Sequence, residues 1–234
     1  MSFPAALPHS PITKVLDGVH VVRGGFRMGP GVVIGRTMTI VETSNGLAIL
    51  NAMRLTEAGQ AELDRLGKVR HLVHLSDSHG ADEPYYVDRY APEVWAPSTA
   101  KSAAIKPTRT LDTSPIEGAA TFDYPGTSGW TECGLWLPRG GGTLVTTDAL
   151  QNHADQQHSS LLGRIMTPLM GFKGGVIVAP MWRKYQRVSG AQVSHALSRA
   201  LEQRFANLIT GHGPAVIGGA EELARAAVAS AAAD

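Results

Sequence analysis

Residues 72–84, LVHLSDSHGADEP, decide how the rest of this 234-residue chain is interpreted. The apolar start of this stretch is typical of a buried strand, and the loop after it carries His, Asp and Glu side chains. Ligands in layered α/β folds often lie beyond the carboxyl ends of strands, so this loop is a candidate binding site. Residues 143–148, TLVTTD, and 208–213, LITGHG, repeat the arrangement of an apolar run followed by a possible metal ligand.

His79, Asp148 and His212 are the side chains at these three predicted strand ends. Imidazole nitrogen and carboxylate oxygen suit Zn, Fe or Mn, and no Cys stands nearby to favour a thiolate site. We expect the three side chains to meet, either around one divalent ion or as a hydrogen-bonded cluster without metal. Both alternatives remain open at the level of sequence.

The composition is that of a globular protein, with 43% hydrophobic and 18% charged residues. The length suits one domain, and we take residues 1–234 as a single domain. The net charge is +1 with both signs interspersed, which argues against a nucleic-acid partner and leaves a small molecule as the expected one. Whether the chain forms a homo-oligomer is not determined by its sequence.

The single Cys133 cannot form an internal disulfide, and no secretory signal pattern opens the chain. We therefore expect a cytoplasmic location. No run approaches the ~20 apolar residues of a membrane span, so we also expect no membrane partner.

Apolar periodicity and turn residues predict a mixed α/β order. Predicted strands cover residues 12–22, 32–42, 47–50, 69–75, 94–96, 119–124, 131–137, 143–147, 176–179 and 207–210. Predicted helices cover 56–66, 86–90, 98–104, 161–170, 191–205 and 220–232. Thr56 is the expected N-cap of the first helix and Gly67 its end. The pattern predicts a layered α/β sandwich.

The order of these motifs resembles the metallo-β-lactamase fold superfamily, from about residue 12 to residue 226. That family binds its metals with a His-x-His-x-Asp-His loop, a later His, an Asp that closes a strand, and a final His. Ser78-His79 resembles the start of that loop, Asp148 matches the Asp, and His212 in Gly-His-Gly matches the final His. The resemblance implies a four-layer αβ/βα sandwich with two mixed sheets flanked by helices.

Four positions depart from the family pattern. Ala81, Glu83 and Pro84 stand where the loop has His, Asp and His, and Thr127 in Tyr-Pro-Gly-Thr replaces the later His. A two-metal site needs ligands for both ions, so the resemblance implies at most a mononuclear site at His79, Asp148 and His212. Glu83 is the predicted fourth ligand, with Asp82 as the alternative.

The remaining polar residues near the motif have less specific interpretations. Asp82 is the candidate catalytic base, whereas capping of a following helix explains Glu83 and Pro84 equally well. His153 and His158 both fit a solvated loop best, and His153 is the better candidate of the two for the same cleft. Residues 182–185, Trp-Arg-Lys-Tyr, are interpreted as a surface turn with a packed Trp, and Cys133 as a core residue.

Two functions follow as hypotheses. The first is a metal-dependent hydrolase with one divalent ion, Zn, Fe or Mn, that acts on a small ester, lactone or phosphoester. The second is a metal-free, inactive relative that binds a small ligand.

Overall fold

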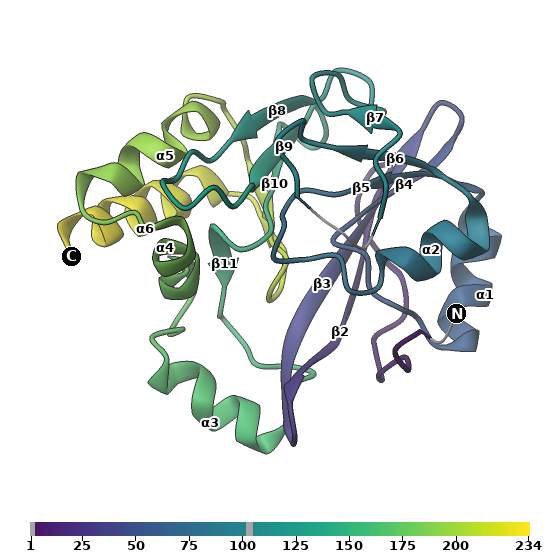
Figure 1. Cartoon of the computed structure of the whole chain (residues 1–234), viewed down its shortest axis with the longest axis horizontal. Helices are drawn as coiled ribbons and strands as arrows, with labels where there is room; N and C mark the ends of the chain where they lie inside the picture. Colours follow the sequence, from purple (N-terminus) through teal and green to yellow (C-terminus); the bar gives the residue numbers. More distant parts are fainter. Residues whose placement is uncertain (1–2, 102–104) are drawn as a thin grey trace.

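The computed structural model describes residues 3–101 and 105–234 (Figure 1). In the N-terminal half the strands are β1 (Thr13–Leu16), β2 (Val19–Gly29), β3 (Val32–Thr43), β4 (Gly46–Leu50), β5 (Val69–Val73), β6 (Glu93–Ala96) and β7 (Arg109–Thr110). They form one sheet in that order, antiparallel from β1 to β4 and parallel from β4 to β7. Helices α1 (Glu57–Leu66) and α2 (Glu83–Tyr90) connect its parallel strands.

A second sheet has the strand order β14-β13-β10-β9-β8. Its strands are β8 (Ala120–Asp123), β9 (Cys133–Leu137), β10 (Thr143–Val145), β13 (Asn207–Ile209) and β14 (Val216–Ile217). A small sheet pairs β11 (Leu150–Asn152) with β12 (Val176–Val178). The helices of this half are α3 (Leu161–Leu169), α4 (Pro180–Gln186), α5 (Ala191–Leu201) and α6 (Ala220–Ala233).

Neighbouring residues on the central strands are buried on opposite faces of their sheets. In β5, Leu72 packs with the core under α1 and α2, whereas Val73 packs between the two large sheets. In β13, Leu208 packs under α5 and α6, whereas Ile209 faces the other sheet. Because side chains alternate along a strand, two adjacent buried residues mean that both faces are covered.

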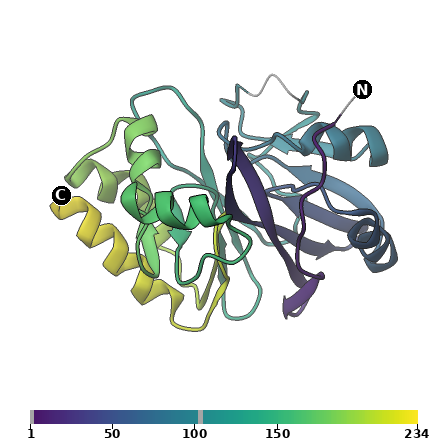
Figure 2. The same cartoon turned by 90° about the horizontal axis from the view of Figure 1, so that it is seen from below.

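The chain therefore forms four layers, with helices outside each of two facing sheets. Figure 2 shows α1 and α2 on one side and α5 and α6 on the other. The four-layer αβ/βα sandwich predicted from the sequence is confirmed. Among the described residues, no helix is both long and apolar enough to span a bilayer.

Several predicted elements differ from the structure. Residues 12–22 are two strands rather than one, because Asp17 and Gly18 form a turn and Gly18 has φ of 67°. The helix predicted over 98–104 is wrong for residues 98–101, which form a turn and irregular chain, while 102–104 lie outside the described residues. Residues 182–185 belong to helix α4 instead of a surface turn, although Trp182 is packed as predicted.

Thr56 is the N-cap of α1. Thr56 precedes the helix and its hydroxyl accepts a hydrogen bond from the Gly59 amide, as predicted. Thr56→Ala should lower the free energy of unfolding by ~1 kcal/mol, because that amide loses its partner. Urea denaturation measures the loss, and Thr56→Ser, which keeps the hydroxyl, is the matched control. An equal loss in both variants would contradict the capping role.

Candidate metal centre

Paired strands of the second sheet bring Asp148 and His212 together. β10 and β13 are parallel neighbours, with Val145 opposite Ile209. Asp148 and His212 each lie three residues beyond these paired residues, so both side chains emerge at the same edge. Gly211 also donates a backbone hydrogen bond to the Thr147 carbonyl, which ties the two loops to each other.

The loop after β5 carries His79 to the same edge from the other sheet. The Cys133 amide donates to the Leu75 carbonyl, and a β-bridge pairs Ser76 with Glu132. These contacts join the start of the loop after β5 to the second sheet. The strand ends singled out in the sequence therefore meet between the two large sheets.

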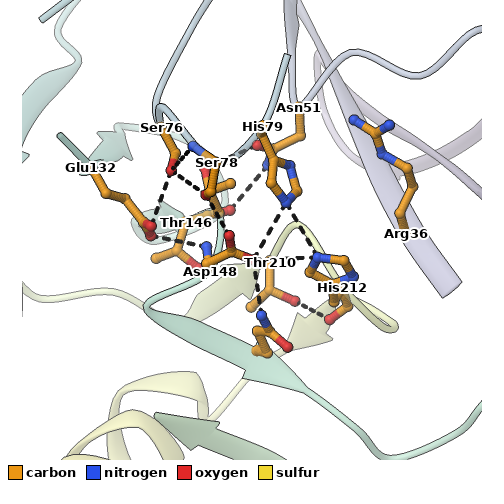
Figure 3. Close-up of polar contacts among 12 residues, drawn as sticks. Arg36, Asn51, Ser76, Ser78, His79, Glu132, Thr146, Asp148, Thr210 and His212 are labelled. Carbon is orange, nitrogen blue, oxygen red and sulfur yellow. Dashed lines mark hydrogen bonds and ion pairs between the residues drawn. The ribbon is translucent and has the colours of Figure 1, made fainter. Parts of the chain in front are cut away.

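The ligand atoms of the three side chains form a nearly equilateral triangle (Figure 3). His79 Nε2 lies 3.2 Å from His212 Nε2, and Asp148 Oδ1 lies 3.3 Å from each of these nitrogens. Metal–ligand bonds of ~2.0–2.1 Å in a tetrahedron separate the ligand atoms by ~3.3–3.4 Å. The three atoms thus already have the spacing of one face of a tetrahedral site.

Both imidazoles can offer a lone pair toward the centre of this triangle. His212 Nδ1 lies 2.8 Å from the Gly35 carbonyl oxygen, which can only accept, so Nδ1 carries the proton and neutral His212 has its lone pair on Nε2. Burial lowers the pKa of His79, despite the opposing charge of Asp148, so this imidazole is neutral near pH 7. Neutral imidazole is the form that binds a metal.

The Asp148 carboxylate is fixed in place by neighbours on both oxygens. Ser78 Oγ donates to Oδ2 at 2.6 Å, and Gln151 Nε2 donates to Oδ1 at 3.0 Å. Burial alone would raise the pKa of Asp148, but its electrostatic interactions and hydrogen bonds with His79 and His212 outweigh burial and hold the pKa well below its usual range. The carboxylate is therefore ionised.

Glu132 lies beneath Asp148 and was not recognised from the sequence. One of its oxygens accepts from the Asp148 amide at 2.9 Å and the Ala149 amide at 2.7 Å, and the other accepts from Ser76 Oγ at 3.2 Å. Burial and the charge of Asp148 raise the pKa of Glu132 to about 8, because they outweigh these hydrogen bonds, which lower it. A single Glu before an apolar strand gives no local signal for such a role.

The structure places Glu83, the predicted fourth ligand, outside the group of three. Its carboxylate is buried and lies 2.9 Å and 3.0 Å from Nδ1 of His74. Glu83 is also the first residue of α2, in agreement with the alternative interpretation of a helix start. His74 belongs to the apolar run at residues 72–75. Its contact with Glu83 explains why a carboxylate is found at this buried position.

Asp82, the predicted catalytic base, also has other partners. Its Oδ2 lies 3.2 Å from Arg36 Nη1 and accepts from the Arg54 amide at 3.1 Å. Arg36 is itself buried and donates to the Ala52 carbonyl. Asp82 does not line the cavity above the three candidate ligands.

The positions that depart from the family motif offer no replacement ligands. Ala81 lines the cavity beside His79 with a methyl group. Thr127 is tied to α4, through its amide to the Gln186 carbonyl and its hydroxyl to the Arg187 carbonyl. Neither position supplies a strong nitrogen, sulfur or carboxylate ligand.

A cavity of about 400 Å³ opens above the three side chains. His79, Asp148 and His212 line it together with Ser78 and Gln151. His153 also lines it, whereas His158 does not. The rest of the wall is largely apolar: Phe26, Val32, Ile34, Met166, Met170, Phe172, Met181, Trp182 and Tyr185. Polar groups collected at one point of an apolar cavity are typical of small-molecule sites.

The buried pair of His74 and Glu83 predicts a pH-dependent contribution to stability. Burial lowers the pKa of His74, but its hydrogen bond to Glu83 and the charges of Glu83 and Asp77 outweigh burial and raise it above 6.5. Protonated His74 therefore stabilises the fold below pH 6.5, and this contribution is lost as the pH rises through the raised pKa.

Glu83→Gln should therefore lower the free energy of unfolding by about 3 kcal/mol just below pH 6.5. The loss should be smaller well above this pH, where His74 is neutral. Urea denaturation of both proteins across this pH range gives the difference. Glu117→Gln, at an exposed position, is the control. A loss that is the same at every pH would contradict a charged pair.

Comparison with known proteins gives matches in structure rather than in sequence. No protein-family model matches the chain, and no curated protein sequence does. The DIM-1 metallo-β-lactamase exposed to ceftazidime is similar with a TM-score of 0.65 and 16% identity, over 98% of this chain and 99% of that one. The mono-zinc form of the FIM-1 metallo-β-lactamase from Pseudomonas aeruginosa has a TM-score of 0.64 and 14% identity, over 99% of both chains.

A metallo-β-lactamase from Hirschia baltica is also similar, with a TM-score of 0.61 and 14% identity over 94% of this chain and 98% of that one. These likenesses cover nearly the whole chain at low identity. They agree with the resemblance to the metallo-β-lactamase superfamily that was inferred from the motifs at the strand ends. The chain therefore has the fold of the metallo-β-lactamase superfamily.

Proposed function

We propose that the protein is a hydrolase that binds one divalent metal ion through His79, Asp148 and His212 and cleaves a small carboxylic ester or lactone. The observation that carries the proposal is the triangle of ligand atoms, 3.2 to 3.3 Å apart, in the wall of the cavity. The mono-zinc form of FIM-1 supports the same view, because it is a similar structure with one zinc.

A divalent ion at this position supplies Lewis acidity for a carbonyl oxygen and lowers the pKa of water. The protein's own contribution is orientation. The Gly35 carbonyl fixes the ring of His212, and Ser78 and Gln151 fix the carboxylate of Asp148. Such partners of metal ligands set ligand direction and basicity. The proposal does not use Asp82 as a base, since Arg36 and the Arg54 amide occupy its carboxylate.

The cavity favours an uncharged substrate over a phosphoester. Arg23 and Arg36 are the cationic side chains in its described lining. Arg23 is paired with Asp155 through two hydrogen bonds, and Arg36 is paired with Asp82. Recognition of a phosphate group uses cations that are free to form charge-assisted bonds. The largely apolar wall fits the acyl part of an ester or lactone instead.

The metal-free binding protein is the second candidate. It is favoured by the loss of ligands at Ala81, Pro84 and Thr127, and by the hydrogen-bonding distances within the triangle, which do not require an ion. Under this alternative the same cavity binds the ligand, and no bond is cleaved.

Metal analysis of protein purified without chelator tests the proposal. We expect about one ion per chain, because the motif lacks ligands for a second. Removal of the ion with a chelator should abolish hydrolysis of p-nitrophenyl butyrate, and added Zn²⁺ should restore it. Bis-p-nitrophenyl phosphate is the comparison substrate and should be a poor one. Metal-free protein that folds and binds no added Zn²⁺ would favour the second candidate.

A further inference from the structure

Helix α3 carries an apolar surface that is not covered by the rest of the described chain. Its Leu161 and Leu169 are 78% and 81% exposed, although large apolar side chains are usually buried. The exposed residues form a group that we call the α3 patch: Met28, Leu161, Leu162, Ile165, Met166, Leu169 and Met170. Contiguous exposed apolar surface of this kind marks an interaction site.

The α3 patch projects from the molecule. Figure 1 shows α3 at the bottom, beside the tips of β2 and β3 and apart from the other helices. Ser160 holds the start of the helix against the hairpin, since its hydroxyl donates to the Gly31 carbonyl and its amide donates to the Val33 carbonyl. The hairpin tip adds Met28 to the patch.

The charged side chains on the two segments that carry the α3 patch are basic. Exposed Arg27, Arg164 and Lys173 lie on the same two segments as the patch. No Asp or Glu occurs between residues 156 and 173, the stretch that contains α3, Arg164 and Lys173. A basic rim around exposed Leu and Ile side chains is the pattern of a helix that lies in the interface of an anionic membrane.

A second copy of the chain fits this surface less well. A two-fold contact brings the same surface of each subunit together. It would place Arg164 and Lys173 of one copy near those of the other, without acidic partners on the segment. An acidic protein is also less favoured, because hot spots between proteins are enriched in Trp and Tyr rather than Leu.

The α3 patch is continuous with the cavity. Met28, Met166 and Met170 line the cavity and also belong to the exposed group. The cavity therefore opens toward the surface that the patch would bury. A molecule dissolved in a lipid layer could reach the cavity without crossing water.

We propose that the protein docks on anionic membrane surfaces through the α3 patch, with α3 lying in the lipid headgroup region and Arg27, Arg164 and Lys173 contacting lipid phosphates. This docking differs from the expectation of no membrane partner, which rested on the lack of a membrane-spanning run. It goes beyond the proposed hydrolase activity and does not depend on it.

Co-sedimentation with vesicles tests the docking. We expect the protein to bind vesicles that contain phosphatidylglycerol, and to bind phosphatidylcholine vesicles much less. Leu161→Gln with Leu169→Gln should weaken binding by more than about tenfold, because two exposed Leu side chains no longer enter the lipid. Leu223→Gln, at an exposed position on α6, is the matched control and should bind as the unaltered protein does.

The charge contribution is measured with Arg164→Gln and Lys173→Gln. Each should weaken binding to the anionic vesicles by about fivefold, and Lys68→Gln, between α1 and β5, should not. Circular dichroism checks that every variant is folded. Asp148→Asn should bind vesicles normally, so failure of the docking proposal and failure of the metal proposal are distinguishable.

Three results would overturn the docking proposal. The first is no binding to either kind of vesicle. The second is equal binding by the double Leu variant, since charge alone would then account for the association. The third is a dimer in analytical ultracentrifugation that the double Leu variant abolishes, because the patch would then bind a second copy of the chain.

Discussion

Asp148→Asn is expected to abolish metal binding and hydrolysis together. The amide keeps the shape of the side chain, and it can still accept the hydrogen bond from Ser78, but it removes the negative charge that balances the cation. We expect the affinity for Zn²⁺ to fall by more than about 100-fold, since loss of even a partner of a ligand costs 10- to 100-fold. Metal content and a zinc titration monitored by calorimetry give the result.

The control for this variant is Asp155→Asn. Asp155 also lines the cavity, but its carboxylate is bonded to Arg23 and does not belong to the group of three. It should leave metal content unchanged. If Asp148→Asn instead keeps its metal content and loses only ~1–3 kcal/mol of stability, Asp148 is an anchor for its hydrogen-bonding partners. That result would favour the second candidate function, a metal-free protein that binds a small ligand.

Gly213→Ala is expected to cause the largest loss of stability. Gly213 follows His212 and has φ of 91°, which side-chain-bearing residues rarely adopt. A Cβ at this position would lie 1.5 Å from the carbonyl oxygen of Asn152, where only movement of the backbone could relieve the clash. We expect the free energy of unfolding to fall by ~4 kcal/mol or more, as for other severe steric conflicts.

Gly218→Ala separates the two causes of that loss. Gly218 has φ of 80°, but nothing lies within 4 Å of a Cβ built there. This variant should therefore show only the backbone cost, ~1–2 kcal/mol. Urea denaturation compares the two, and metal content reports whether the loop of His212 has moved. Equal losses for the two variants would contradict a clash between Gly213 and the β11 segment.

Local patterns in the sequence determined a large part of the fold. Short apolar runs such as the one that contains Leu208 and Ile209 indicated strands, and Thr56 marked a helix start, because propensity and side-chain period act over a few residues. The order of three strand ends also indicated where His79, Asp148 and His212 would be found. The same reasoning failed at residues 98–101, where a short helical pattern forms a turn.

Contacts between distant segments were decided by the tertiary structure alone. Glu132 accepts from the Asp148 amide and Glu83 is bonded to His74, and no local pattern specifies which buried charges will be neighbours. Helix α3 is the clearest case. Its apolar residues are those of a core-facing helix, yet Leu161 and Leu169 lie in solvent, because exposure depends on what packs against a helix as well as on its sequence. The sequence by itself therefore determined the layers and the strand ends, whereas the partners of the buried charges and the open face of α3 required the folded chain.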